Sequence, residues 1–553
     1  MSHYKPDPNK SVNLTIDGIP VTVPEGTTIL DAAKKVNIAI PSLCHFSGLG
    51  KRAVCRLCVV ECDGRGKLVP ACANDVTEGV KVVTNNLRIL NIRKTIIELI
   101  LTNHPPECLN CIKNKNCELQ TLAADFGILK IPFRRDAADH RLPSIEGGTL
   151  VRNMARCVKC GRCVEVCQEQ QTIRAINSSH RGFNYEVATP YGQSLCDGPC
   201  IFCGKCVEVC PVGAIYENEQ YLAVRAELNK SGQRIVIQIP PSAAETVALE
   251  MGLAPGSITG GKLVTALKLA GFYKVINSGE SAEITVQDEY HELLDRVKKH
   301  GKLPIITSCS PSFFTFVRIF YPDLAGHLPS NRKSPQQNFS MAAKKLFTGE
   351  AGTDNAPEIK TVSVMPCIAN KFETWQPAQS ADAQSGQNSP PAFSGPVFSG
   401  ITGHPDFALT VKELVLLIRQ SGIEIHNLVE TPFDSLSGGS GIDRSINTAS
   451  QQAALSASAS PSSPMEAIIQ NIYKAYTGKI PMLPAFNEVQ ENPGIKEAEA
   501  ELNGTKAKIM TVNGLANARI LLDSIRRGEC NAAFIEIKDC SGCKNPVRAP
   551  SPV

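Results

Sequence analysis

The sequence predicts a multidomain chain that combines α/β and α+β folds, and three observations lead to this class. Its 553 residues are too many for one hydrophobic core, which indicates several domains. Most of the 22 cysteines fall before residue 211, in closely spaced groups typical of small metal-binding modules. In the remainder, patterns of buried strands alternate with helical patterns, as in an α/β fold with parallel strands.

Residues 1–90 are expected to form a small mixed domain. The stretch "VNLTIDGIPVTVPEGTTILDAAKKV" reads as two alternating strands joined around Asp17-Gly18, followed by a helix that starts near Ile29. Thr27 or Thr28 is the expected N-cap, because a hydroxyl can accept a hydrogen bond from the first turn of the helix. This order of elements resembles a β-grasp domain.

The first cysteine group lies in the loops after that helix. Four thiolates closing around two irons form a [2Fe-2S] centre, and a loop that follows a β-grasp helix can supply three of them. A structural zinc ion, which also accepts four thiolates, is the alternative. Cys62 is left over and is not expected to be a ligand. The predicted ligands are Cys44, Cys55, Cys58 and Cys72.

A second group, in the segment 91–145, follows a helix predicted over residues 87–101. The stretch "HPPECLNCIKNKNC" offers one imidazole and three thiolates, a less negative ligand set that suits a [4Fe-4S] cluster of shifted potential. Taken alone, the same ligands could form a zinc knuckle. The predicted ligands are His104, Cys108, Cys111 and Cys117.

The strongest pattern lies in residues 146–225, where "CVKCGRCVEVC" precedes "CIFCGKCVEVCPVGA". In a two-cluster ferredoxin each run binds one [4Fe-4S] cluster, while its fourth cysteine crosses to the other. Cluster one is predicted on Cys157, Cys160, Cys163 and Cys210, and cluster two on Cys200, Cys203, Cys206 and Cys167. Cys196 is expected to be a bystander. Four sites in series indicate an electron-transfer chain.

Residues 226–553 are predicted to form an α/β domain with parallel strand pairing. "RIVIQIPPS" and "KLPIITSCSP" read as buried strands, and "KLVTALKLAG" and "YHELLDRVKK" read as helices between them. The stretches "QPAQSADAQSGQNSPPAFSG" and "NTASQQAALSASASPSSP" are rich in Ser, Ala, Gln and Pro and lack apolar periodicity, so they are interpreted as flexible loops.

This order of modules resembles the large [FeFe] hydrogenases, and the first part also resembles the iron-sulfur subunit of complex I. Beyond the ferredoxin runs, "TSCSP", "KSPQQ", "VMPCIANKFE" and "FIEIKDCSGC" are similar to successive motifs of the hydrogenase catalytic domain. The resemblance covers nearly the whole chain. It implies a domain related to the one that holds the H-cluster, a [4Fe-4S] cluster joined by a thiolate to a diiron unit with carbon monoxide, cyanide and dithiolate ligands.

The motifs depart from the family pattern at the diiron pocket. The first usually reads T-S-C-C-P, in which the first cysteine relays protons and the second binds the cluster; Cys309 matches the relay position and Ser310 the ligand position. A hydroxyl is a much poorer iron ligand than a thiolate. The second motif keeps Cys367 but has Asn370 where the family has a lysine that can hold a cyanide ligand, with Lys371 one residue later.

The third motif is altered as well. Two residues separate its cysteines where the family has three, and Lys538 and Asp539 precede them. The departures imply that the diiron unit is absent. A residual [4Fe-4S] cluster would need a local backbone rotation at Cys309, because adjacent residues of an extended segment point to opposite sides. Its candidate ligands are Cys309, Cys367, Cys540 and Cys543.

Two carboxylates of the family's proton path have counterparts. Glu289 and Glu292 lie at helical spacing in "DEYHELL", where exposed helix glutamates are the alternative interpretation. A proton path without its metal has no obvious purpose. The domain is therefore interpreted as a hydrogenase scaffold whose catalytic centre is lost or altered.

The sequence thus predicts an electron-transfer subunit rather than a hydrogen-evolving enzyme. As the resemblance implies, a chain of this kind in an electron-bifurcating complex of anaerobes links a flavin- and NAD(P)-binding subunit, similar to the complex I module, to ferredoxin or to a catalytic subunit such as formate dehydrogenase. We find no convincing G-x-G-x-x-G fingerprint, so nicotinamide chemistry is expected in a partner. The alternatives are an active [FeFe] hydrogenase with unusual ligands and a redox or hydrogen sensor.

Composition argues against other classes. With 57 basic and 53 acidic residues, the chain has no broad charge excess for nucleic acid. It has no apolar run long enough for a membrane span and no apolar segment typical of a secretion signal. Because reducing thiol pools oppose disulfides, the tightly spaced cysteines indicate metal ligands in a cytoplasmic protein.

Overall fold

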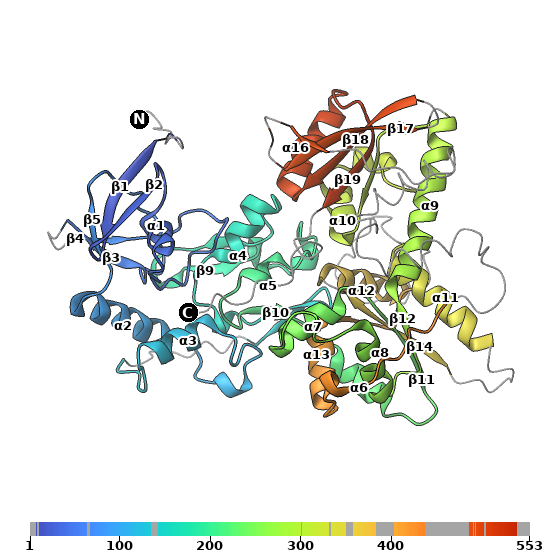
Figure 1. The fold of residues 1–553 in the computed structure, drawn as a ribbon, viewed down its shortest axis with the longest axis horizontal. Helices are drawn as coiled ribbons and strands as arrows, with labels where there is room; N and C mark the ends of the chain where they lie inside the picture. The colour runs from blue at the N-terminus through green and yellow to red at the C-terminus, as the bar shows by residue number, and fades with distance from the viewer. Residues whose placement is uncertain are drawn as a thin grey trace.

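The computed structural model describes residues 7, 10–63, 67–133, 142–299, 301–330, 333–349, 358–365, 367–382, 403–436, 486–489, 492, 494–502 and 505–538. Figure 1 shows the N-terminal domain and the cysteine-rich segments on one side of the molecule. The other described residues form two lobes, one around β11 (Arg234–Ile239) and one around β18 (Thr505–Asn513).

The N-terminal domain is a five-stranded sheet with one helix packed on it. The strand order is β2-β1-β5-β3-β4, for β1 (Ser11–Ile16), β2 (Ile19–Pro24), β3 (Val59–Cys62), β4 (Lys67–Pro70) and β5 (Lys81–Val83). The predicted hairpin is confirmed: Asp17 and Gly18 both have positive φ, as this two-residue turn requires. Helix α1 (Ile29–Lys35) follows Thr28, whose hydroxyl accepts from the Asp31 N–H.

Helix α2 (Leu87–Thr102), predicted over 87–101, leads from this sheet to the cysteine-rich segments. The helix α3 (Glu118–Asp125) follows, and then an antiparallel sheet of β10 (Ile215–Glu217), β7 (Leu150–Arg152) and β6 (Ser144–Glu146). Two short helices, α4 (Arg162–Glu165) and α5 (Lys205–Val209), start inside the cysteine runs. Each follows a glycine, Gly161 or Gly204, with φ of 75°, a conformation that glycine adopts without strain.

The lobe around β11 contains a four-stranded parallel sheet. Its order is β12-β11-β14-β15, for β12 (Lys274–Asn277), β14 (Ile359–Met365) and β15 (Phe407–Thr410) beside β11. One face is covered by α6 (Tyr221–Leu228), α7 (Ala243–Met251), α8 (Gly260–Leu269) and α13 (Val411–Gln420), and the other packs on α11 (Pro335–Gly349).

The lobe around β18 contains a mixed sheet. Its order is β13-β19-β18-β17-β16, for β13 (Ile305–Ser308), β19 (Ala532–Lys538), β17 (Ile495–Leu502) and β16 (Asn487–Glu488). Helices α10 (Pro311–Phe320) and α16 (Leu515–Arg526) pack in a core that is continuous with that of the cysteine runs, and α9 (Ser278–Lys298) packs in a separate small core of this lobe. Because the core is shared, the cysteine runs and this lobe are packed as one body.

The predicted parallel pairing is confirmed, and the structure adds that the two quoted strands belong to different sheets. "RIVIQI" is β11, while "IITS" is β13, whose parallel neighbour is β19. The interpretation of residues 376–395 as a flexible loop is wrong for its first part. Helix α12 (Ala369–Asp382) continues into it, favoured by its Ala and Gln residues although Pro377 opposes a helix, whereas residues 383–395 and the second insert, 447–464, lie outside the described residues.

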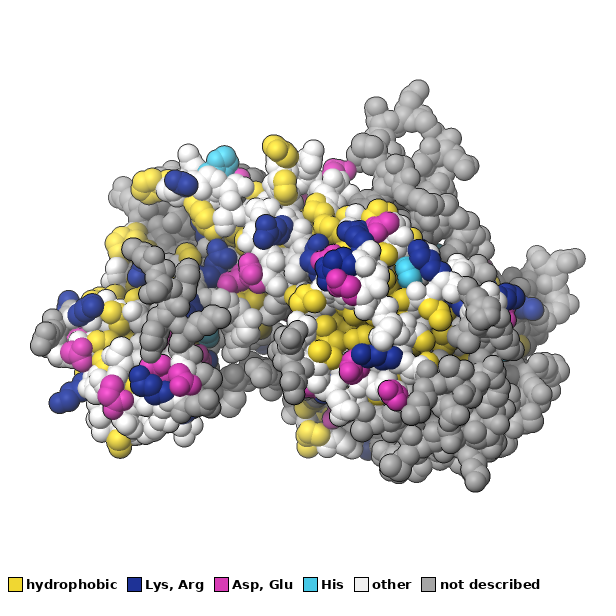
Figure 2. All heavy atoms as spheres, turned by 90° about the horizontal axis from the view of Figure 1, so that it is seen from above, with side chains coloured by type: hydrophobic (Ala, Val, Ile, Leu, Met, Phe, Trp, Pro, Cys, Tyr) yellow, Lys and Arg dark blue, Asp and Glu magenta, His cyan; other side chains and the backbone are white. Residues whose placement is uncertain are grey.

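The surface carries mixed charge. On the face drawn in Figure 2, Lys and Arg side chains lie among Asp and Glu side chains rather than gathering in one field. Among the described residues, no helix combines the length and apolarity needed to cross a membrane.

Candidate metal centres

The first cysteine set comes together beside the N-terminal sheet. Cys44 lies in the loop after α1, Cys55 and Cys58 precede β3, and Cys72 follows β4. The Cys44 thiol is hydrogen-bonded to those of Cys55 and Cys72, and Cys72 also bonds to Cys58. These bonds hold the pKa of Cys44 far below its ordinary value, and the pKa of Cys58 is lowered to about 7 by its bond with Cys72. Four adjacent thiols of which some readily ionise suit a cluster that binds thiolates.

The second set lines one pocket between the end of α2 and the start of α3. Its lining includes all four predicted ligands, His104, Cys108, Cys111 and Cys117. The backbone of Gly213 lies close to this set: a Cβ there would lie 2.8 Å from the Cys111 sulfur. Such a close approach requires glycine, which explains this residue in "PVGA".

The two cysteine runs adopt matching local structures. Lys159 and Phe202, each in the middle of a C-x-x-C step, have positive φ of 56° and 52°. Each run also points a backbone N–H at its first thiol, from Lys159 to Cys157 and from Phe202 to Cys200, both at 3.4 Å. N–H groups directed at sulfur stabilise the negative charge of a cluster.

The structure brings the predicted ligands of each ferredoxin cluster together. One pocket is lined by the four cysteines predicted for cluster one, namely Cys157, Cys160, Cys163 and Cys210. The four predicted for cluster two interact electrostatically with one another, namely Cys167, Cys200, Cys203 and Cys206. Burial raises the pKa of the Cys163 and Cys206 thiols, so both lie in a dry environment that bound iron would have to offset.

The zinc alternatives for the first two sets stay open, because four gathered thiolate or imidazole ligands suit a structural zinc ion as well.

The remaining described thiols have other environments. Cys62 is buried in the core of the N-terminal sheet, and Cys530 packs against the core shared by α10 and α16. Cys196 is near enough to Cys200 to affect its pKa, so this thiol lies beside the second cluster site.

In the hydrogenase-like domain, Ser310 is engaged by its own loop. The residue is buried, with 3% of its surface exposed, and its hydroxyl lies 2.6 Å from that of Ser312. Its N–H donates to Ser308, which in turn donates to the Ile537 carbonyl at 2.7 Å. The hydroxyls of Ser308, Ser310 and Ser312 are therefore engaged within this loop and with β19. The predicted partners Cys540 and Cys543 lie outside the described residues.

Residues of the second motif also bond to other groups of the protein. Asn370 donates to the Cys367 sulfur at 3.4 Å. Lys371 is 1% exposed and forms ion pairs with Glu413, at 2.5 Å, and with Glu217, and it donates to the Asn218 carbonyl at 3.1 Å. This lysine therefore does not replace the one missing at position 370.

The group formed by Glu217, Lys371 and Glu413, the buried triad, joins β10 of the cysteine-rich part to α12 and α13. Burial raises the pKa of Glu217 to about 8, although Lys371 acts in the opposite direction. The pKa of the neighbouring Glu219 is also raised by burial. At neutral pH the triad therefore holds a proton on Glu217.

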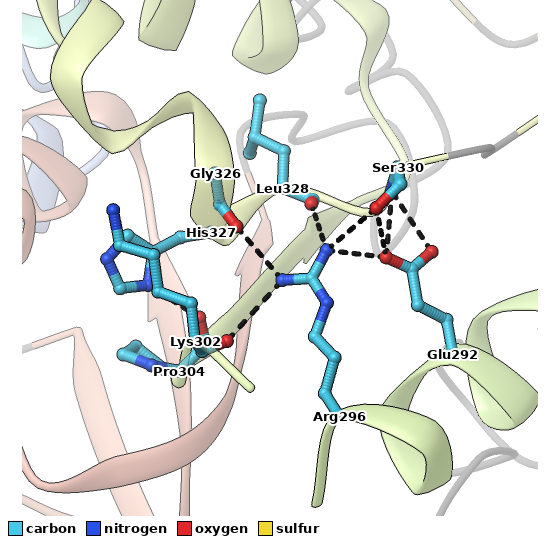
Figure 3. Close-up of polar contacts among 8 residues, drawn as sticks. All are labelled: Glu292, Arg296, Lys302, Pro304, Gly326, His327, Leu328 and Ser330. Atoms are coloured by element: carbon cyan, nitrogen blue, oxygen red, sulfur yellow. Dashed lines mark hydrogen bonds and ion pairs between the residues drawn. The ribbon is translucent and has the colours of Figure 1, made fainter. Parts of the chain in front are cut away.

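The two glutamates that match carboxylates of the family's proton path are both held in place by hydrogen bonds. Buried Glu289 accepts from the Thr307 hydroxyl at 3.0 and 2.9 Å. Glu292 accepts from the N–H and hydroxyl of Ser330 and pairs with Arg296 at 2.5 Å (Figure 3). These contacts lower the pKa of Glu292 despite its partial burial. Neither residue is an exposed helix glutamate.

An aromatic contact joins the site predicted for cluster two to the hydrogenase-like domain. Phe202, between Cys200 and Cys203, stacks on Phe372 of α12 with ring centroids 4.0 Å apart. Gly204 also lies close to Ile368, since a Cβ on the glycine would come within 2.9 Å of it. The second cluster site therefore faces the segment that carries Cys367.

Sequence reasoning missed several of these residues. Spacing of cysteines predicts ligands, but it contains no signal for buried charges such as Lys371, or Arg162, which pairs with Glu118, because the partners are distant in sequence. Buried Arg93 of α2 is a further example: it donates to the Val59 carbonyl at 2.8 Å beside Cys58. The contact of Phe202, inside "CIFC", with Phe372 was likewise not predictable from the sequence.

Comparison with known families gives one match for each part of the chain. "Iron only hydrogenase large subunit, C-terminal domain" matches residues 233–545. "2Fe-2S iron-sulfur cluster binding domain" matches residues 9–87. "NADH-ubiquinone oxidoreductase-G iron-sulfur binding region" matches 93–132, and "NADH-quinone oxidoreductase subunit 3, ferredoxin-like domain" matches 147–216. The chain thus carries 2Fe-2S and 4Fe-4S cluster-binding domains.

Individual relatives agree with this division. NADP-reducing hydrogenase subunit HndD of Solidesulfovibrio fructosivorans is 35% identical over 96% of this chain and 87% of its own length. Iron hydrogenase 1 of Clostridium pasteurianum is 29% identical over 96% of this chain and 88% of its own. The NADH-ubiquinone oxidoreductase 75 kDa subunit of Reclinomonas americana is 34% identical over 32% of this chain and 26% of its own.

Proposed function

Because the chain belongs to the iron-only hydrogenase large-subunit family, we propose that it is an electron-transfer subunit whose hydrogenase-like domain lacks the diiron centre. Its iron-sulfur sites would carry electrons between a flavin- and NAD(P)-binding partner and ferredoxin, or a catalytic subunit such as formate dehydrogenase. The names of the relatives support a nicotinamide-linked complex, since one is an NADP-reducing hydrogenase subunit and another an NADH-ubiquinone oxidoreductase subunit.

The proposal assigns one role to each part of the chain. Residues 1–90 hold the [2Fe-2S] cluster, 91–145 the cluster with one histidine ligand, and 146–225 the two ferredoxin clusters. Residues 226–553 form the altered hydrogenase domain. When bound, the clusters supply one-electron transfer, while the chain positions the thiolates and keeps water from the buried ones. Their thiolate chemistry favours a cytoplasmic location.

The observation that carries the proposal is the direction of the Lys371 side chain. In the family, a lysine near the second motif can hold a cyanide ligand, and here the lysine next to that position is buried against Glu217 and Glu413. Removing the lysine would leave the buried Glu413 carboxylate without its cation, at a cost of several kcal/mol. The lysine is therefore not free to hold a cyanide ligand. Ser310, hydrogen-bonded to Ser312, adds to the same argument.

Infrared spectroscopy tests the absence of the diiron unit. The protein is produced anaerobically together with the hydrogenase maturation proteins and is then assayed for hydrogen evolution. We expect no metal carbonyl or cyanide bands and only background turnover. Bands together with turnover would overturn the proposal.

A reduction assay tests the division of labour. The purified chain should be reduced by dithionite but not by NADH or NADPH, and adding a flavin-binding partner should restore reduction by the nicotinamide. Fast reduction of the single chain by either nucleotide would show that the nicotinamide site lies in this chain.

One group of observations favours a second candidate, an active hydrogenase with unusual ligands. Cys309 is retained, Glu289 and Glu292 are ordered by Thr307 and Ser330, and the chain resembles HndD over most of its length. The infrared experiment distinguishes this candidate from the first.

A further inference from the structure

Arg162 lies inside the first cysteine run, between Cys160 and Cys163, and its side chain is almost fully buried. Only 3% of it is exposed. An arginine is charged at every physiological pH, and a buried charge is costly unless it is paired. The surroundings of Arg162 therefore need an explanation.

Its first partner belongs to the second ligand set. Arg162 binds both carboxylate oxygens of Glu118 in a fork, at 2.6 and 2.8 Å, and Glu118 directly follows Cys117. Its second contact belongs to the first ligand set, because the guanidinium lies 5.6 Å from the centre of the Phe46 ring, two residues after Cys44. One side chain thus touches the loops of three predicted centres.

The guanidinium also has unused hydrogen-bonding capacity. Its Nε–H is buried and has no hydrogen-bond partner in the described part of the protein. Both Cys44 and Cys160 lie close enough to interact with its charge. A buried N–H without an acceptor is rare, and here it lies among the thiols of two cluster sites.

We propose that Arg162 is a positioning residue whose charge favours the reduced state of both the [2Fe-2S] centre and cluster one. This inference rests on the cluster assignments in the proposed function. Each reduction adds one electron, supplied by a partner or a chemical reductant, and so one negative charge to a cluster. The charge of Arg162 does not change, so it stabilises the reduced form more than the oxidised form.

The negative charge of Glu118 reduces this effect. Removing Arg162 and removing the charge of Glu118 should therefore shift the reduction potentials in opposite directions. Removing Arg162 leaves the Glu118 carboxylate, so both centres should become harder to reduce. Removing the Glu118 charge leaves the arginine uncompensated, so both should become easier to reduce. A purely structural role would not predict shifts of opposite sign.

Lys205 provides a matched control. It stands at the same place in the second run, between Cys203 and Cys206, and pairs with Glu208 at 2.9 Å on its own helix. Because this ion pair is local to the second run, Lys205→Gln should leave the [2Fe-2S] centre unchanged.

The experiment is a redox titration of the full chain, followed by electron paramagnetic resonance, for R162Q, R162K, E118Q and K205Q. In R162Q the reduction equilibrium of the [2Fe-2S] centre and of cluster one should shift about tenfold toward the oxidised form, or 59 mV for one electron. E118Q should shift both the other way, and R162K should stay close to the unmodified protein.

Iron content is measured on every variant. Unchanged potentials in R162Q with full iron content would overturn the proposal. If R162Q loses its clusters, E118Q decides, because it keeps the arginine: an unchanged or lowered potential in E118Q would also overturn it. The titration uses chemical mediators, so its outcome is independent of the partner and of hydrogen turnover.

Discussion

The cysteine-rich part and the hydrogenase-like domain differ in what their metal-binding motifs contact. In the first, the described structure places each predicted ligand beside the others of its set. In the second, Ser310 bonds to Ser312, and Lys371 to two carboxylates. The difference follows from how far apart in the sequence the ligands of each site lie. A ferredoxin run holds three predicted ligands in one short loop, whereas the candidate ligands of the hydrogenase-like domain come from three distant segments, each of which can change alone.

Loss of one ferredoxin ligand should produce the largest effect and test the first half of this comparison. In Cys163→Ser, cluster one loses a thiolate and should be strongly perturbed, while its neighbour changes mildly, because the two share one small fold. Electron paramagnetic resonance of the reduced variant measures both. Cys196→Ser is the control, with both signals expected to remain. Intact cubane signals in Cys163→Ser would contradict the assignment of Cys163 as a ligand of cluster one.

Lys371→Met should cost about 3–5 kcal/mol of unfolding free energy, because it leaves the buried Glu413 carboxylate without its cation. Chemical denaturation measures this value. As a control, Lys344→Met removes a more exposed lysine that pairs with Asp406 at 3.0 Å, and its effect should be small. Equal effects would mean that the ion pairs of Lys371 do not hold it in place. The lysine could then still serve the diiron pocket.

The buried triad should also give stability a particular pH dependence. The pKa of Glu217 is 4.5 when unfolded and about 8 when folded, so the folded state keeps a proton that the unfolded state releases between these values. Stability from this group is therefore full below pH 4.5 and is lost as the pH rises through about 8. Glu217→Gln should flatten this slope in a series of melting curves. A slope that is the same in the variant would contradict the assignment.

Ser310→Cys should have the smallest effect, namely no recovery of hydrogen turnover. The other departures at positions 370 and 538–543 remain, so one restored thiolate does not rebuild the pocket. Hydrogen evolution is measured after coexpression with maturation proteins. Turnover in this single variant would show that Ser310 alone accounts for the lack of activity, and that the other departures do not matter.

Local patterns predicted much of the fold. Alternation around Asp17-Gly18 predicted the first hairpin, and helical spacing predicted α2 to within a residue at its end. Partners distant in sequence were not predictable. Continuous apolar runs look alike whether they join one sheet or two, so the separation of β11 from β13 needed the structure.

The candidate site divides along the same line. Cysteine spacing predicted which thiols would gather, since their distances are fixed within one loop. It did not predict where Lys371 would point, because that depends on Glu217 and Glu413, which lie far away in sequence. The same holds for the contact of Arg162 with Glu118.

The stack of Phe202 on Phe372 limits how this chain can be shortened. Phe202 is fully buried, and α12 of the hydrogenase-like domain contributes to its cover. A truncation near residue 225 would yield a minimal electron carrier on paper, but it would open the second cluster site to solvent and oxygen. The hydrogenase-like domain thus shields the second cluster site whatever its own chemistry, which gives selection a separate reason to preserve the scaffold.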